Sequence, residues 1–214
     1  MIIAFLGPDG SGKSSVVKAL EDTARRGFTG VDRYHLFPFR KEGDSGAGAA
    51  VTDPHSQPPR SYPECVLKLL YWFALYVAGH WLNIRARSRA GRLIVFDRYY
   101  HDLLVDPLRY RFGGPMWLAR WIGKLIPQPD LWILLDAPPE VLHARKQEVS
   151  FEELARQRGA YLRLVQGMNN NVVVDASQPL DDVVREVNMR ILDLMAARTA
   201  RRLGLPDRGP RDVR

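Results

Sequence analysis

The sequence predicts an α/β protein built on a five-stranded parallel sheet with helices on both faces. Two observations predict this fold. Five short apolar segments rich in β-branched residues occur along the chain, and segments with helical spacing of apolar residues lie between them. Strands that alternate with helices form parallel sheets with right-handed crossovers. A chain of 214 residues with 46% hydrophobic content is long enough for one such domain.

The first apolar segment leads into a glycine-rich motif. Residues 1–6 read MIIAFL, which suits a strand buried on both faces. Residues 7–14 read GPDGSGKS and fit the pattern G-x-x-x-x-G-K-[ST] at every fixed position. Val16, Val17 and Leu20 follow at helical spacing, so the motif opens directly into a helix. This arrangement predicts a phosphate-binding loop, or P-loop.

The residue types of the loop suit a triphosphate. Gly7, Gly10 and Gly12 can take positive φ and let backbone N–H groups converge on a phosphate. Lys13 is expected to reach the β and γ oxygens, and the Ser14 hydroxyl is expected to bind Mg²⁺. The alternative is a glycine-rich turn that happens to precede a helix. The strand before the motif, the helix after it and the intact Gly-Lys-Ser favour the phosphate-binding loop.

The four later strands are expected at residues 31–37, 92–97, 131–136 and 171–175. The strand at 92–97 ends in Asp97, which is followed by Arg98. Ligands collect at the carboxyl edge of a parallel sheet, so Asp97 is placed to reach the Mg²⁺ shell or the attacking group. The alternative is an aspartate that caps the next helix. Arg98 has the right side chain for bidentate contact with a phosphate.

One predicted helix, at residues 64–89, is unusually apolar. A membrane span is the alternative for its nearly uncharged part, residues 65–79. About twenty apolar residues are needed to cross a bilayer, and this run is shorter and is followed at once by polar residues. We therefore expect a buried central helix and no membrane span. Trp72, Phe73 and Tyr76 are expected in the core or in a pocket wall.

Further helices are expected at 116–125, after Pro139, after Ser150 and over the segment from Val183 to Leu194. A basic helix-turn-helix at about 144–160 includes Arg156 on its second helix. It is either a solvated face or a mobile lid that brings charge to a transferring phosphoryl group. The residue pattern leaves both interpretations open.

The composition favours a cytoplasmic protein with a single domain at 1–197. The single cysteine, Cys65, cannot form an internal disulfide, and no signal peptide is evident. The net charge of +7 lies partly in residues 198–214, which we interpret as a disordered basic tail. We do not take the charge as a sign of nucleic-acid binding. Residues 41–63 are rich in Gly, Ala, Ser and Pro and are expected to form a flexible insertion.

Several motifs together resemble the thymidylate kinase family of P-loop nucleoside monophosphate kinases. Residues 7–14 resemble that family's phosphate-binding loop, with an acid at Asp9. Residues 37–40 (FPFR) resemble its Phe-Pro-x-Arg acceptor motif. Residues 97–99 match its Asp-Arg-Tyr motif. Residues 129–140, with Arg145 and Arg156, are similar to its strand and lid. Residues 175–179 occupy the place of its adenine-side loop. The resemblance covers most of the chain.

The resemblance implies ATP bound by the loop, Mg²⁺ on Ser14 and Asp97 directly or through water, and a small phosphate acceptor. The nucleotide-binding residues it implies are Gly7, Asp9, Gly10, Ser11, Gly12, Lys13, Ser14 and Ser15. The acceptor-binding residues it implies are Phe37, Arg40, Phe73, Val77, Arg98 and Tyr99. The catalytic residues it implies are Asp9, Lys13, Asp97, Arg98, Arg145 and Arg156. It also implies a homodimer formed through the long helices.

One position departs from the family pattern. Twenty residues before the aspartate of Asp-Arg-Tyr the family usually has an arginine that reads the thymine base, and here this position is Val77. Loss of one charged hydrogen bond costs about 1.5–3 kcal/mol, or roughly ten- to hundredfold in affinity. The resemblance makes dTMP the default acceptor. An alternative acceptor, a hydroxyl of a nucleoside, sugar or other metabolite, stays open. A different class of protein, a nucleotide-dependent switch or a membrane-associated binding protein, also stays open.

Overall fold

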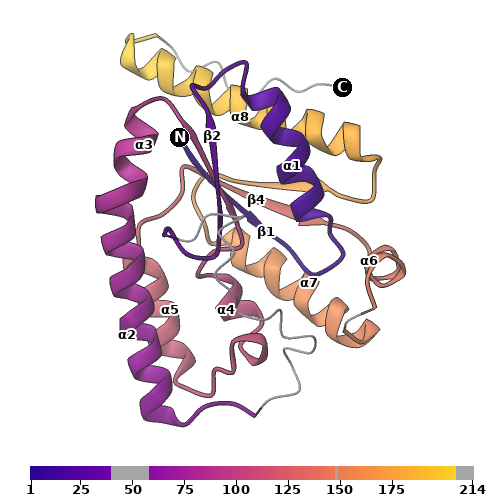
Figure 1. Ribbon diagram of the computed structural model, residues 1–214. Helices are drawn as coiled ribbons and strands as arrows, with labels where there is room; N and C mark the ends of the chain where they lie inside the picture. Colours follow the sequence, from indigo (N-terminus) through magenta and orange to yellow (C-terminus); the bar gives the residue numbers. More distant parts are fainter. Residues whose placement is uncertain (40–57, 148, 206–214) are drawn as a thin grey trace.

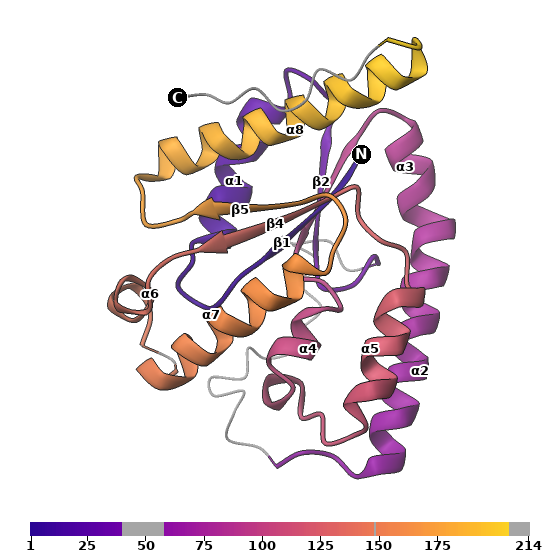
Figure 2. The same ribbon diagram turned by 180° about the vertical axis from the view of Figure 1, so that it is seen from behind.

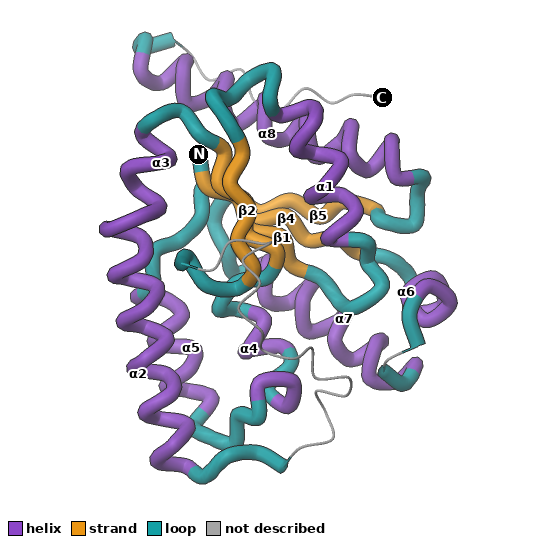
Figure 3. Tube along the Cα trace, viewed as in Figure 1, coloured by secondary structure: helices purple, strands orange, loops and turns teal. Residues whose placement is uncertain are grey.

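The computed structural model describes residues 1–39, 58–147 and 149–205 of the chain. Its centre is a five-stranded parallel sheet with the strand order β2-β3-β1-β4-β5 (Figure 3). The strands are β1 (Ile2–Leu6), β2 (Val31–His35), β3 (Leu93–Asp97), β4 (Leu131–Asp136) and β5 (Asn171–Asp175). The α/β fold with a five-stranded parallel sheet is thus confirmed.

The apolar character of the three central strands explains their place in the sheet. Every residue of β1 and β3 is buried, and so are the first five residues of β4. Strands that are covered on both faces are near-continuous runs of apolar residues, whereas a strand at the edge of the sheet can contain polar residues. β5 is such an edge, and its pattern of burial is mostly exposed. The P-loop therefore leaves the sheet at its centre.

Helices cover both faces of the sheet (Figures 1 and 2). On one face α1 (Lys13–Ala24) and α8 (Leu180–Arg202) lie side by side and pack on Ile3 and Phe5 of β1. On the other face Ala4 and Leu6 of β1 join a core cluster with the remaining large helices. These are α2 (Tyr62–Gly79), α5 (Met116–Leu125) and α7 (Phe151–Gln166). Alternate residues of one strand thus build two separate cores.

Short elements complete the chain. The π-helix η1 (His80–Ile84) and α3 (Arg85–Arg89) continue α2 without a break, and α6 (Pro139–Arg145) follows β4. The helix α4 (Asp102–Val105) and the 3₁₀ turn η2 (Leu108–Tyr110) follow β3. The 3₁₀ turn η2 lies within the polar segment of residues 108–114. The labelled helices α4 and α6 lie near the carboxyl edge of the sheet (Figure 1).

The expectation that residues 64–89 form a buried central helix is wrong for one side of that helix. Trp72 and Tyr76 are buried, as predicted, but apolar side chains on the opposite side are exposed. These exposed residues are Leu67, Leu70, Tyr71, Trp81 and Leu82. The continuous helix Tyr62–Arg89 is long and apolar enough to cross a membrane by length and composition, with 28% of its apolar window buried. Apolar spacing showed that the segment is helical but not which neighbours cover it.

The continuous helix Tyr62–Arg89 also holds the segment that follows β2 in place. A Cβ atom on Gly79 would lie 2.3 Å from Cγ of Pro38, so only glycine permits this close approach. The Asn83 amide donates to the Pro38 carbonyl at 2.7 Å, and the Tyr76 hydroxyl donates to the Leu36 carbonyl. Leu36 has a positive φ of 64° and ends the strand two residues earlier than the predicted 31–37. The predicted acceptor motif 37–40 therefore starts from a firmly held turn.

The C-terminal helix extends beyond the expected start of the basic tail at 198. α8 ends at Arg202, and Arg198 donates to Asp130 at 2.7 Å. Asp130 in turn accepts from the backbone N–H of Ile2 at 2.7 Å, so this part of the segment is tied to the start of β1. The rest of the expected tail, residues 206–214, lies outside the described residues, as do residues 41–57 of the expected insertion.

Candidate active site

The candidate active site lies at the carboxyl ends of β1 and β3, the edge at which parallel sheets bind ligands. A cavity of about 490 Å³ opens there. Its lining residues are Asp9, Gly10, Gly12, Lys13, Ser14, Ser15, His35, Asp97, Arg98, Arg109, Arg145 and Lys146. Lys13 and Asp97 therefore face the same cavity, as phosphoryl transfer requires.

The P-loop adopts the backbone conformation that its glycines predict. Gly7, Gly10 and Gly12 have φ values of 142°, 83° and 82°. A Cβ atom on Gly10 would lie 2.6 Å from the carbonyl oxygen of Leu142, so a side chain there would displace α6. Gly12 caps α1, whose first residue is Lys13. The N-terminus of α1, with its unpaired N–H groups and positive dipole end, thus faces the cavity.

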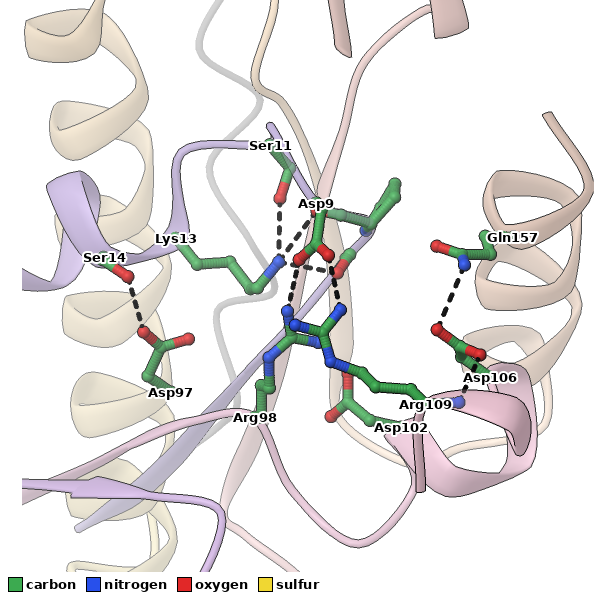
Figure 4. A network of polar contacts seen from close by, with 12 residues as sticks. Asp9, Ser11, Lys13, Ser14, Asp97, Arg98, Asp102, Asp106, Arg109 and Gln157 are labelled. Carbon is green, nitrogen blue, oxygen red and sulfur yellow. Dashed lines mark hydrogen bonds and ion pairs between the residues drawn. The ribbon is translucent and has the colours of Figure 1, made fainter. Parts of the chain in front are cut away.

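The Lys13 ammonium lies inside the loop (Figure 4). It donates to the carbonyls of Gly7 and Pro8 at 2.7 Å and 2.9 Å, and to Oγ of Ser11 at 3.3 Å. Burial and the nearby Arg98 lower the pKa of Lys13 to about 8, while Asp9 and Asp97 oppose this shift. A buried cation held by carbonyls is a suitable partner for triphosphate oxygens.

Ser14 and Asp97 form the part of the site that fits a magnesium ion. The Ser14 hydroxyl donates to a carboxylate oxygen of Asp97 at 2.8 Å (Figure 4). In the part of the chain that the structure describes, no three His, Cys, Asp or Glu side chains cluster as a metal site. Mg²⁺ needs only one or two oxygen ligands from a protein when phosphates and waters supply the others. This hydroxyl and carboxylate pair meets that requirement.

Asp9 lies between two arginines. One of its carboxylate oxygens pairs with Arg98 and the other pairs with Arg109 (Figure 4). Burial raises the pKa of Asp9, but the charges of Arg98, Arg109 and Lys13 together outweigh it and hold the pKa well below its usual value. The P-loop acid is therefore ionised and fixes two guanidinium groups at the cavity.

Arg98 is held by a second acid as well. Its φ is 73°, an unusual value for a residue other than glycine, and its guanidinium lies 3.6 Å from Asp102. Asp102 also accepts from the Tyr161 hydroxyl at 2.6 Å and from the N–H of Tyr99 at 2.9 Å. A strained backbone that its surroundings hold in place is common at functional sites. Asp102 was given no role from the sequence, but it anchors Arg98.

A second cavity lies beside the P-loop, on the side of α8. It measures about 210 Å³ and is lined by Ser11, Gly12, Ser15, Val16, Arg145, Ala176, Gln178, Leu180 and Val183. Residues 175–179, which resemble an adenine-side loop, thus contribute to an apolar pocket adjacent to the phosphate loop. Arg145 donates to the Ala176 carbonyl at 2.8 Å and lines both cavities.

The other expected lid arginine is not brought to the cavity. Arg156 pairs with Glu153 at 2.6 Å, one turn earlier on α7, and donates to the Val105 carbonyl at 3.1 Å. Ser150 caps α7 by accepting from the N–H of Glu153, and α7 begins directly after Ser150, where the sequence predicted a helix. Arg158 forms a two-bond pair with Asp136 at the end of β4. The basic helix therefore packs against the domain.

Of the expected acceptor residues that the structure describes, Arg98 alone is among those that line the 490 Å³ cavity. Phe37 stands edge-on to Trp72 at 5.1 Å between ring centroids, and the Tyr99 hydroxyl donates to the Pro127 carbonyl at 2.6 Å. Phe73 and Val77 are half-buried on α2 and are not among the residues that line the cavity. Arg40 lies outside the described residues.

Sequence reasoning missed Arg109. It lies on η2, a single turn with no motif of its own, twelve residues after Asp97. Its presence in a polar turn directly after the helix that follows Asp-Arg-Tyr was the only available signal. His35 at the end of β2 and Lys146 after α6 also line the cavity, and sequence reasoning assigned neither of them to the site.

Known proteins resemble this chain over most of its length. The family model described as thymidylate kinase matches residues 5–187 of the chain. A probable thymidylate kinase of Archaeoglobus fulgidus is 30% identical over 192 residues, with 87% of this chain and 92% of that protein covered. A thymidylate kinase of Chlamydia abortus is 24% identical, with 94% of this chain and all of that protein covered.

A solved structure shows the same fold. The crystal structure of thymidylate kinase from Ehrlichia chaffeensis matches with a TM-score of 0.57 at 17% identity. The match covers 90% of this chain and 98% of that one. The P-loop and the Asp97-Arg98-Tyr99 segment both lie within the region matched by the family model. This chain therefore belongs to the thymidylate kinase family.

Proposed function

We propose that the protein transfers the γ-phosphoryl group of ATP to a nucleoside monophosphate, with dTMP as the first acceptor to test. The observation that carries this proposal is the single cavity shared by the P-loop, Asp97, Arg98 and Arg145. Membership of the thymidylate kinase family supports the same reaction. The cationic groups of the cavity outnumber its acids, which suits two anionic substrates.

Each residue has a role in this proposal. Lys13 and the N–H groups at the start of α1 bind the β- and γ-phosphates, while the pocket beside Ala176 and Val183 receives the adenine. Arg98 binds the acceptor phosphate, and Arg145 stabilises charge on the transferring group. Arg40, which follows the held turn at Pro38, is proposed as a further phosphate ligand from the sequence motif alone.

Ser14 and Asp97 are the residues that would hold Mg²⁺. When bound there, the ion neutralises charge on the β- and γ-phosphates. The acceptor is already an anion, so the site needs no strong base and works by positioning and charge neutralisation. Asp9 contributes by fixing the guanidinium groups that meet the acceptor.

A second acceptor class is a hydroxyl of a nucleoside, a sugar or another metabolite. One observation favours it: Val77 stands where a base-reading arginine is usual, on the half-buried side of α2. A hydroxyl acceptor would need a carboxylate as a base, and Asp97 faces the cavity.

A substrate panel tests the proposal. ADP release is measured with MgATP and dTMP, dUMP or CMP, and in parallel with thymidine, uridine, cytidine and a set of hexoses. Phosphorylation of dTMP with no turnover of the nucleosides and sugars is the expected result. Turnover of the nucleosides or sugars alone would replace the proposal by the hydroxyl acceptor.

We further propose a cytoplasmic homodimer formed through the exposed apolar side of α2 and η1. The exposed side chains of Leu67, Leu70, Tyr71, Trp81 and Leu82 lie along one side of a continuous helix, and such a patch favours a partner. Light scattering coupled to size-exclusion chromatography should give about twice the chain mass of 24.4 kDa. Leu70→Glu should give the monomer, and a monomeric wild-type protein would refute the dimer.

A further inference from the structure

The segment that follows β3 brings a second arginine to the acceptor side of the cavity. Arg98 at the end of β3 and Arg109 on η2 pair with different oxygens of the same carboxylate, that of Asp9. A guanidinium carries five N–H donors, and Asp9 takes only a part of them. The Arg98 side chain is 10% exposed, whereas that of Arg109 is 22% exposed. Both arginines line the cavity, and Arg109 is the more exposed of the two.

Two buried side chains position the turn that carries Arg109. The Asp106 carboxylate accepts from the backbone N–H of Arg109 at 3.1 Å and from the Gln157 amide at 3.2 Å (Figure 4). Gln157 belongs to α7, and both it and Asp106 are almost fully buried. The Arg156 contact with the Val105 carbonyl adds a further bond between α7 and the end of α4. The turn is thus fixed to α7 rather than left as a free loop.

We propose that Arg109 is a ligand of the acceptor phosphate and acts together with Arg98. Asp9 holds the two guanidinium groups close to each other, and two such groups can bind one phosphate through parallel charge-assisted hydrogen bonds. The two arginines and Asp9 leave a surplus of one positive charge, which attracts the negatively charged phosphate of the acceptor. Gln157 and Asp106 act as positioning residues, since they reach the acceptor only through the turn.

This inference rests on the proposed function, because it assumes that the acceptor carries a phosphate. The inference assigns different roles to the two parts of the predicted lid at about 144–160. Arg145 serves the donor side of the cavity, whereas α7 supports the acceptor side through Gln157 and the turn at Asp106. The binding of the acceptor therefore depends on α7, although α7 contributes no residue to the cavity lining.

Steady-state kinetics of Arg109→Gln tests the assignment, with Arg120→Gln on the exposed face of α5 as the matched control. The KM for the phosphorylated acceptor of the panel should rise at least tenfold in Arg109→Gln. The KM for ATP should change less than twofold, and Arg120→Gln should match the wild type. Arg109→Lys, which keeps the charge but not the fork of donors, should recover only part of the loss.

A second variant keeps the test decisive. Gln157→Leu preserves volume but removes the donor to Asp106, so the acceptor KM should rise three- to tenfold with an unchanged ATP KM. An unchanged acceptor KM in Arg109→Gln, or equal losses for both substrates together with a lowered Tm, would overturn the assignment. A wild-type enzyme that phosphorylates another phosphorylated acceptor but not dTMP would refute only the choice of dTMP. Phosphorylation of hydroxyl acceptors alone would refute both proposals.

Discussion

The Ser14 hydroxyl donates to the Asp97 carboxylate at 2.8 Å, although 83 residues separate the two in the chain. This bond joins the first turn of α1 to the end of β3, so the phosphate-binding loop and the Asp-Arg-Tyr segment form one site. The parallel register of β1 and β3, with Phe5 beside Asp97, makes the contact possible. A P-loop and an acid that faced different cavities could not catalyse phosphoryl transfer together.

The Ser14 and Asp97 pair predicts a magnesium-dependent defect. Asp97→Asn should lower kcat/KM about 10²- to 10³-fold and raise the Mg²⁺ concentration needed for half-maximal rate, because the amide is a weaker ligand than the carboxylate. Rates are measured over a Mg²⁺ titration, with circular dichroism to check folding. Asp181→Asn, on the exposed first turn of α8, should behave as the wild type. An unaltered Mg²⁺ requirement in Asp97→Asn would contradict the assignment.

Val77→Arg should restore a base-reading side chain. If the acceptor base approaches this part of α2, the new charged hydrogen bond should lower the KM for dTMP by roughly tenfold, and at most about a hundredfold. The KM for ATP should not change. Val77→Met serves as an apolar control of similar length. No gain for dTMP over other acceptors in Val77→Arg would mean that the base binds elsewhere.

The two arginines of the lid region should differ in importance. Arg145 lines both cavities, whereas Arg156 pairs with Glu153 on the same helix. Arg145→Gln should reduce kcat about a hundredfold, and Arg156→Gln should reduce it less than about fivefold. Initial rates at saturating substrates compare the two variants directly. A larger loss in Arg156→Gln would show that α7 moves Arg156 into the cavity during turnover.

His101 should make the protein less stable in mild acid. Its ring stands edge-on to Trp132 at 4.7 Å, and burial lowers its pKa to about 4. Between pH 6.5 and 4 the unfolded chain binds a proton at this histidine that the folded chain does not, so stability must fall as the pH falls. The difference between this pKa and the usual histidine pKa of 6.5 corresponds to about 3 kcal/mol of unfolding free energy over this range.

Urea denaturation of the wild type and of His101→Gln at pH 7.0 and pH 4.5 measures this effect. The wild type should lose more unfolding free energy between the two pH values than the variant does. Parallel losses in both proteins would mean that His101 is not the group responsible.

Local pattern was enough to predict the sheet and the loop. The three central strands are buried on both faces, so their apolar runs stand out, and the P-loop needs glycine at fixed positions because of its positive φ values. Asp97 and Arg98 could be placed as well, since strand ends in a parallel sheet share one edge. These features depend on neighbours in sequence or on general sheet geometry.

Features that depend on tertiary contacts could not be predicted. The apolar spacing of α2 is the same whether a neighbour or solvent covers its outer side, so the exposure of Leu82 was not evident. Asp106 and Gln157 hold the turn η2 that carries Arg109, and the bond between Gln157 and Asp106 spans 51 residues. Arg156 was assigned by the resemblance, but its pairing with Glu153 depends on the side-chain conformation on α7.

A crystal structure with an analogue that joins adenosine to thymidine through five phosphates would test the central claim most directly, because the claim is that donor and acceptor meet in one cavity. The account predicts adenine beside Val183, the phosphate chain along Lys13 and the Ser14 and Asp97 pair, and the thymidine-side phosphate between Arg98 and Arg109. A phosphate chain that leaves the cavity without contacting either arginine would contradict it.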